Sequence, residues 1–201
     1  MVGGKPNFEW QVAAVNRVER LLKTVTAALD TAGIPYAVIG GNAVATWVAT
    51  RDVGAVRATK DVDLLLERSD LERAGEVLAL LGFIRDEVLG TPVFMEAADP
   101  RPSQGVHIVL ANEKVRVTAK YPAPSVTRAE RVASGFLVLG LESLVTMKLD
   151  ANRRVDQVHV EDLLRIGLID AGLAGRLPED LRDRLCHIRD TMEWLTDPPI
   201  F

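Results

Sequence analysis

Two aspartates separated by one residue, Asp61 and Asp63, are the best candidates in this 201-residue sequence for binding a metal ion. Asp61 directly precedes the mostly apolar run 62–66, and Asp63 lies within it. Such a run is typical of a strand. Residues two apart on a strand point to the same face, so both carboxylates would project together while Val62 faces the core. Two close negative charges need a cation, and Mg²⁺, or Mn²⁺ in its place, binds one or two carboxylates together with substrate phosphates. The plain alternative is an exposed pair of acids on the polar face of a strand.

A glycine pair, Gly40-Gly41, lies between an apolar strand at 36–39 and a helix that we expect to begin at Asn42. Glycines let the backbone approach a ligand closely, and N–H groups near a helix N-terminus bind phosphate. Alone, such a pair is most often a tight turn. Together with the aspartates on the next strand, it predicts a site that holds a triphosphate between backbone donors and a metal ion. Lys60, directly before the aspartates, could also contact phosphate.

Hydrophobic periodicity and turn residues predict the elements that position these groups. We expect a loop at 51–60, a helix over 70–81 capped by Ser69, and several short strands within 83–120, one of them at 115–117. The other expected elements are a helix over 8–32, strands at 61–67 and 136–139, and helices over 142–153, 158–168 and 178–195. This order predicts an α/β (α+β) fold with a small mixed sheet flanked by helices. We expect a catalytic domain at 1–139 and a helical C-terminal subdomain at 140–201.

Composition limits the class of protein further. The net charge of -4 argues against capture of nucleic acid by overall charge, although a local basic face could still bind it. Cys186 is the only cysteine, which excludes an internal disulfide and a thiolate metal cluster. No apolar run approaches the roughly 20 residues of a membrane-spanning helix, and residues 1–10 lack the apolar core of a signal peptide. We therefore expect a cytoplasmic protein without a membrane partner.

The two motifs resemble a known signature. Tyr36-Ala-Val-Ile-Gly-Gly-Asn-Ala43, followed by Thr59-Lys-Asp-Val-Asp-Leu-Leu-Leu66, is similar to the Gly-Gly/Ser and Asp-x-Asp motifs of the nucleotidyltransferase superfamily. Within it, the sequence resembles the AbiEii/AbiGii-toxin-like branch, which includes nucleotidyltransferase toxins of bacterial type IV toxin–antitoxin systems. The resemblance covers about residues 8–170. It implies that the glycine pair binds a nucleoside triphosphate (NTP) and that Asp61 and Asp63 hold the metal ions.

A second segment resembles the same branch. Leu144-Val-Thr-Met-Lys148 is similar to its Leu-x-x-x-Lys segment, and the resemblance implies that Lys148 contacts phosphate. Arg153, Arg154 and Asp156 resemble the basic and then acidic segment that follows. Lys148 and the two arginines would form a small cationic cluster toward the anionic site. A solvated polar helix face is an equally good interpretation of the arginines.

The sequence departs from the superfamily pattern at 105–111. Active members usually carry a third carboxylate on a later strand, and this run contains no acid. Strand alternation places His107 on the site side together with Val109. A neutral imidazole could act as a general base or replace the missing ligand, although it suits zinc or manganese better than magnesium. The alternative is a partly buried structural histidine. We expect His159 and His187 to be structural or exposed.

Three functions remain compatible with these patterns. The first is a metal-dependent nucleotidyltransferase that moves a nucleoside monophosphate (NMP) from an NTP to a hydroxyl. The toxin resemblance implies a tRNA 3′ end or a protein hydroxyl as acceptor, and an antitoxin protein as partner. The second is an inactive relative that binds a nucleotide or a protein, which the missing third acid favours. The third is an adenylyltransferase for a small molecule such as an antibiotic, for which an acidic cleft is expected.

Overall fold

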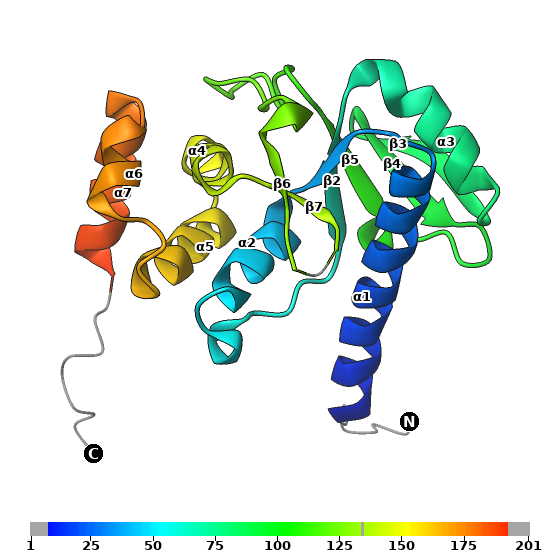
Figure 1. The fold of residues 1–201 in the computed structure, drawn as a ribbon, viewed down its shortest axis with the longest axis horizontal. Coiled ribbons are helices and arrows are strands. Elements are labelled where there is room, and N and C mark those ends of the chain that lie inside the picture. The colour runs from blue at the N-terminus through cyan, green and yellow to red at the C-terminus, as the bar shows by residue number, and fades with distance from the viewer. Residues whose placement is uncertain (1–7, 134, 193–201) are drawn as a thin grey trace, which may run out of the picture.

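The computed structural model describes residues 8–133 and 135–192, and its centre is a seven-stranded mixed sheet (Figure 1). The strand order is β3-β4-β5-β2-β1-β7-β6. β2 pairs antiparallel with β1 and parallel with β5, so the strands next to the glycine pair, the aspartates and His107 are neighbours. In chain order the strands are β1 (Tyr36–Val38), β2 (Val62–Leu66), β3 (Phe83–Val88), β4 (Thr91–Glu96), β5 (Val106–Leu110), β6 (Ala129–Arg131) and β7 (Leu137–Leu139).

The described part of the chain has seven α-helices, and the combination of a mixed sheet with helices is that of the expected α/β fold. They are α1 (Phe8–Thr31), α2 (Gly40–Ala49), α3 (Leu71–Ala79), α4 (Leu141–Ala151), α5 (Arg154–Arg165), α6 (Ala171–Arg176) and α7 (Glu179–Thr191). α1 packs against α3 and β2, whereas α2 packs against β2, β7, α4 and α5. α6 and α7 lie at the far end of the molecule from α1 (Figure 1), and α7 packs on α4 and α5. None of the described helices is long and apolar enough to cross a membrane.

The two central strands are buried on both faces, which explains their apolar sequences. All three residues of β1 are buried, and so are the four apolar residues of β2. Asp63 is the one polar residue of β2 and is partly exposed. A carboxylate in such a strand lowers stability unless it is neutralised or hydrogen-bonded, so its presence there is a reason to look for a ligand.

The first helix agrees with its expected range, but its inward face is shorter than expected. Val18, Leu22 and other apolar residues of its second half are buried. Val12 and Val15, which the periodicity also places inward, are 47% and 43% exposed. At about 1.5 Å per residue, this helix is roughly 36 Å long. Its first turns extend beyond the sheet (Figure 1), so the sheet does not cover Val12 and Val15.

Two expected helix starts are wrong. Asn42 does not cap α2, because the helix begins at Gly40 after Ile39. Ser69 does not cap the next helix either. It lies within a short 3₁₀ turn, Arg68–Asp70, and α3 begins at Leu71. In both cases a residue type that favours helix caps is present near the helix start but not at the capping position itself. Sequence patterns do not locate a helix start to within one or two residues.

The remaining differences concern short elements. The expected strand at 115–117 is a loop, and Val117 is 98% exposed. β6 and α6 were not expected as elements, since each has too few residues for a periodic pattern. The helix expected over 178–195 is observed as α7, and residues 193–195 lie outside the described part of the chain, as does Trp194. The domain division at residue 140 stays a prediction.

Candidate functional site

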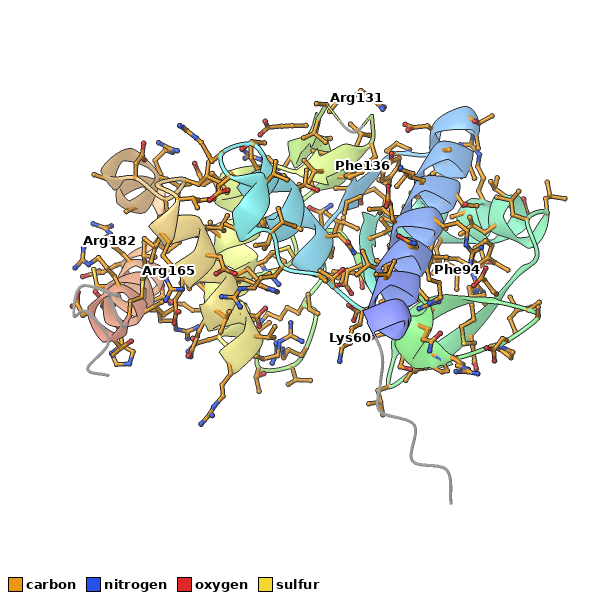
Figure 2. The ribbon with its side chains drawn as sticks, turned by 90° about the horizontal axis from the view of Figure 1, so that it is seen from below. Lys60, Phe94, Arg131, Phe136, Arg165 and Arg182 are labelled. Carbon is orange, nitrogen blue, oxygen red and sulfur yellow. The ribbon has the colours of Figure 1, made fainter. Side chains whose placement is uncertain are left out.

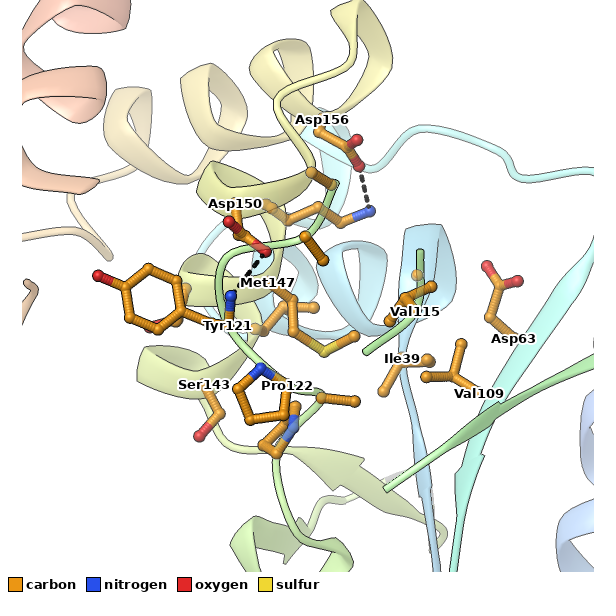
Figure 3. Close-up of a pocket in the computed structure, with 18 of the residues that line it drawn as sticks. Ile39, Asp63, Val109, Val115, Tyr121, Pro122, Ser143, Met147, Asp150 and Asp156 are labelled. Carbon is orange, nitrogen blue, oxygen red and sulfur yellow. Dashed lines mark hydrogen bonds and ion pairs between the residues drawn. The ribbon is translucent and has the colours of Figure 1, made fainter. Parts of the chain in front are cut away.

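A cavity of about 880 Å³ opens between the middle of the sheet, α4 and the loop that precedes β6 (Figure 3). Gly40, Asp63 and His107 line it from the sheet side. Lys148 and Arg153 line it from α4 and from the turn that leads into α5. The structure therefore brings residues of the predicted motifs to one cavity, although Gly40 and Lys148 lie more than 100 residues apart in the chain.

One glycine of the pair, Gly40, lies directly against the Asp63 side chain. Gly40 has φ +67°, and a Cβ atom added there would lie 1.9 Å from Asp63 Oδ2. A Cβ on Gly41 would lie 2.6 Å from Thr59 Cγ2. Both positions therefore require glycine: the first for its backbone conformation and the closeness of the carboxylate, the second for closeness alone. Gly40, the first residue of α2, therefore lies against the Asp63 side chain.

Two polar side chains hold the start of β2 against α2. Asn42 Nδ2 donates a hydrogen bond to the carbonyl oxygen of Asp61 at 2.8 Å. Thr59 Oγ1 donates to Asn42 Oδ1 at 2.9 Å. The sequence patterns did not predict these hydrogen bonds, although both residues belong to the two motifs. Asp61 lies in the bend just before β2, is partly exposed and does not line the cavity.

The charges around Asp63 oppose one another. Burial raises the pKa of its carboxyl, and the nearby negative charge of Asp61 raises it further. Electrostatic interactions with His107, Lys148 and Arg153 lower the same pKa. The carboxylate form of Asp63 therefore needs nearby cations, which a metal ion or these side chains can supply.

His107 lies beside Asp63 in the sheet, because the two residues are register partners on the parallel strands β5 and β2. The expected alternation is confirmed: Val106 and Ile108 are buried, whereas His107 and Val109 line the cavity. The position next to Asp63 thus carries an imidazole and no acid. Among residues 8–133 and 135–192, no group of three His, Cys, Asp or Glu side chains is arranged to hold a metal ion.

A buried carboxylate organises the cationic side of the cavity. Asp156 is 0% exposed and accepts a hydrogen bond from Lys148 Nζ at 3.0 Å and from Arg153 Nε at 2.6 Å. Burial raises the pKa of its carboxyl, but the bonds and charges of Arg153 and Lys148 outweigh this, so the net shift is downward. Lys148 is itself buried, at 6% exposure. The predicted cluster therefore exists for Lys148 and Arg153, while Arg154 is exposed and does not line the cavity.

His159 on α5 is closer to the site than sequence analysis indicated. A Cβ on Gly41 would lie 3.7 Å from His159 Cε1, so the imidazole packs near the start of α2. Its buried Nδ1 has no hydrogen-bond partner among the described residues. Burial and the positive charge of Lys148 lower its pKa to about 4. No spacing to another ligand pointed to His159, and only the tertiary contact between α2 and α5 shows its position.

This depressed pKa predicts a pH-dependent stability. The unfolded chain binds a proton at His159 below about pH 6.5, and the folded chain binds it only near pH 4. The free energy of unfolding therefore decreases as the pH falls from 6.5 to 4. His159 accounts for at most about 3 kcal/mol of this decrease. In urea denaturation, His159→Gln should lose less stability than the wild type between pH 7 and 4.5. The same change at exposed His187 should leave the pH dependence unchanged; equal pH profiles for wild type and His159→Gln would contradict the prediction.

Three further polar or aromatic residues near the two motifs in sequence do not line the cavity. Lys60 is exposed, does not line the cavity, and projects from the surface (Figure 2), so its phosphate contact stays a prediction. Arg57 pairs with the buried Asp162 of α5, with Nε to Oδ2 at 2.7 Å. Trp47 donates from Nε1 to the carbonyl oxygen of Leu139 at 3.0 Å and thereby joins α2 to β7.

The residues present fit a divalent metal ion and a triphosphate. Mg²⁺ needs only one or two carboxylates, because water and substrate phosphates complete its octahedron. Asp61 and Asp63 are residues of this type, but only Asp63 lines the cavity, so the role of Asp61 as a metal ligand stays a prediction. The space beside the Gly40 Cα is occupied by the Asp63 carboxylate, so this glycine lets the acid approach the start of α2 closely.

The fold is that of solved nucleotidyltransferase-like proteins. A nucleotidyltransferase-like protein from Paracoccidioides brasiliensis is 15% identical, with a TM-score of 0.57 over 88% of this chain and 89% of that one. The antibiotic-resistance factor ANT(2″)-Ia in solution is 17% identical, with a TM-score of 0.53 over 88% and 93% of the two chains. Its crystal structure in complex with adenylyl-2″-tobramycin gives a TM-score of 0.50 at 17% identity over 85% and 96%. No family model and no curated protein matches the sequence.

At such low identity these similarities show the fold alone. They confirm the nucleotidyltransferase fold expected from the two motifs. The narrower resemblance to the AbiEii/AbiGii-toxin-like branch stays a prediction.

Proposed function

We propose that this protein is a metal-dependent nucleotidyltransferase, which moves an NMP from an NTP to a hydroxyl group and releases pyrophosphate. The observation that supports this most strongly is the contact between Gly40 and the Asp63 carboxylate at the start of α2. Gly40 and Asp63 line the same cavity, and a glycine backbone at a helix start and a carboxylate are the groups that suit a phosphate and a metal ion. Asp61 and Asp63 would hold Mg²⁺ or Mn²⁺. When bound, the ion would neutralise phosphate charge and stabilise the charge that develops in the transition state.

The protein's own residues would orient the two substrates. The N–H groups at Gly40 and Gly41 bind the triphosphate, and Lys148 and Arg153 neutralise its charge from the opposite side. The acceptor oxygen forms a bond to the α-phosphorus, and the bond from this phosphorus to the bridging oxygen breaks, so that pyrophosphate leaves. A ring nitrogen of His107 takes the proton of the acceptor hydroxyl, since this imidazole occupies the position next to Asp63.

The charges of the cavity favour an anionic acceptor. Three of its four lining acids are already compensated: Asp156 by Lys148 and Arg153, Glu142 by Arg176 at 2.5 Å, and Asp150 by two backbone N–H groups. Figure 3 shows two of these interactions, from Asp156 and from Asp150. Apart from Asp63, which we assign to the metal, no lining carboxylate of the described residues is free to bind a polycationic antibiotic.

Two cations of the cavity have no such compensation. Arg116 and Arg128 line it and form no ion pair with any described residue. We therefore favour a tRNA 3′ end as acceptor over a small cationic molecule, with a protein hydroxyl as the next alternative. In the same proposal the protein is cytoplasmic, and an antitoxin protein is its partner.

A second candidate is an inactive relative that binds nucleotide or protein. The observation that favours it is His107 at the position where the superfamily pattern has a third acid. The two candidates differ in turnover: only the first transfers label from an NTP in a metal-dependent manner.

The test uses purified protein, each α-labelled NTP, Mg²⁺ or Mn²⁺, and bulk tRNA. The wild type should label tRNA or itself with one preferred NTP, and Asp61→Ala should abolish this. Asp183→Ala, an exposed acid on α7 with no hydrogen bond to a described residue, is the matched control and should retain full activity. Equal labelling by wild type and Asp61→Ala would contradict the proposal that Asp61 holds the metal ion. No label from a folded wild type would favour the binding protein.

A further inference from the structure

The hairpin between β3 and β4 has an unusual turn. Val88 pairs with Thr91, so Leu89 and Gly90 form a two-residue loop. Both have positive φ, 51° for Leu89 and 79° for Gly90, as a type I′ turn requires. Asparagine, aspartate or glycine is preferred at the first of these positions. These residues adopt the left-handed region readily, whereas leucine does so at a cost. Leu89 is also fully exposed, so burial does not compensate for this strain.

Leu89 nevertheless lies at the cavity. It lines the cavity together with Thr91 of β4 and with Val115 and Arg116 of the loop after β5. Val115 is 51% exposed, and Val117 of the same loop is 98% exposed. The cavity is thus lined by exposed apolar side chains from two separate segments, Leu89 and Val115, and by the cation Arg116. We call Leu89, Val115 and Arg116 the rim.

The sheet order shows which substrate would meet the rim. The phosphate-binding backbone at Gly40 follows β1, on one side of Asp63, and β5, β4 and β3 follow on the other side. With the triphosphate at the start of α2, the acceptor must reach the α-phosphorus from the β5 side. The hairpin that carries Leu89 lies farther along that same side.

The chemistry of the rim fits a single-stranded nucleic acid. Unpaired bases offer flat apolar faces, and each is linked to a phosphate that an arginine can bind. Arg116 forms no ion pair with a described residue, so its charge is available. The acids nearest to Leu89 in sequence, Asp86 and Glu87, are exposed on β3 and do not line the cavity.

We propose that the rim binds the acceptor strand of RNA: an unpaired base packs on Leu89 and Val115, while Arg116 binds the adjacent phosphate. This inference rests on the proposed function, since it names the surface that presents the acceptor to the transfer site. It also explains why leucine is present at a turn position where asparagine would be less strained.

The test separates RNA binding from transfer. Binding of fluorescent bulk tRNA is measured by anisotropy without NTP, and melting temperature is measured on the same proteins. Leu89→Asn should raise the melting temperature by about 2 °C, because it relieves turn strain, and should weaken tRNA binding at least about fivefold. Leu80→Asn is the matched control, since Leu80 is 88% exposed on the α3 side and does not line the cavity. It should change neither quantity in this way.

Arg116→Gln should weaken binding and reduce its dependence on salt, as expected for the loss of one phosphate contact. A Leu89→Asn protein that binds tRNA as tightly as the wild type would refute the proposal that the rim binds RNA. A wild type that binds no tRNA would refute it as well. Loss of tRNA binding in Leu89→Asn, with no transfer by the wild type, would support the rim and refute the transferase. If only a protein acceptor is labelled and tRNA is not bound, the rim does not bind RNA.

Discussion

Replacing Asp63 with asparagine should abolish nucleotidyl transfer and at the same time leave the fold as stable as the wild type or more stable. The variant keeps the shape that fits against Gly40 but loses the negative charge. Without a charged metal ligand, the rate should fall at least about 10³-fold, or roughly 4 kcal/mol of transition-state free energy. Activity and stability should therefore change in opposite directions at this residue.

The stability change has a defined pH dependence. Burial and Asp61 raise the pKa of the Asp63 carboxyl above its ordinary value of 3.8, so the folded state holds this proton more tightly than the unfolded state. Stability is consequently lost as the pH rises through the folded pKa, and asparagine removes that loss. Urea denaturation at pH 4 and pH 7.5 should show the advantage of Asp63→Asn growing with pH. A destabilised variant, or one that retains transfer, would contradict the assignment.

Replacing Asp156 with alanine should produce the largest loss of stability, about 3–5 kcal/mol. The substitution leaves the buried ammonium of Lys148 without its partner. Arg153 loses the same partner, but its side chain is 59% exposed and can be solvated by water. Thermal unfolding should therefore occur roughly 10 °C lower. Asp190→Ala breaks an exposed ion pair with Arg189 and should have little effect in the same measurement.

A double variant isolates the physical cause. When Lys148→Met is combined with Asp156→Leu, neither member of this buried ion pair carries a charge, and much of the lost stability should return. Transfer should remain low in the double variant, because Lys148 no longer neutralises phosphate. If the double variant is as unstable as Asp156→Ala alone, the loss came from packing and not from an unpaired charge.

The elements that could be predicted from sequence are those with strong local patterns. The buried strands β1 and β2, the glycine pair between strand and helix, and the alternation that exposes His107 to the cavity all depend on neighbouring residues. The resemblance of the two motifs added the fold, which the structure and the solved structures similar to it confirm.

Features that depend on tertiary contacts could not be predicted. The contact of His159 with the start of α2, the Asp162 partner of Arg57 and the position of Leu89 at the cavity all join distant segments. Asn42 was assigned to a helix cap because its type favours one, whereas it bonds to the carbonyl of Asp61. The exposure of Val12 and Val15 depends on the helix extending past the sheet, which periodicity does not report.

The most direct test of the central claim compares NTP labelled at the α-phosphate with NTP labelled at the γ-phosphate, using the preferred nucleotide and acceptor. Transfer of an NMP predicts that α label appears on the acceptor, that γ label is released as pyrophosphate, and that both depend on Asp63. Label from the γ-phosphate on the acceptor, or release of γ label as inorganic phosphate, would instead show a kinase or a hydrolase and contradict nucleotidyl transfer.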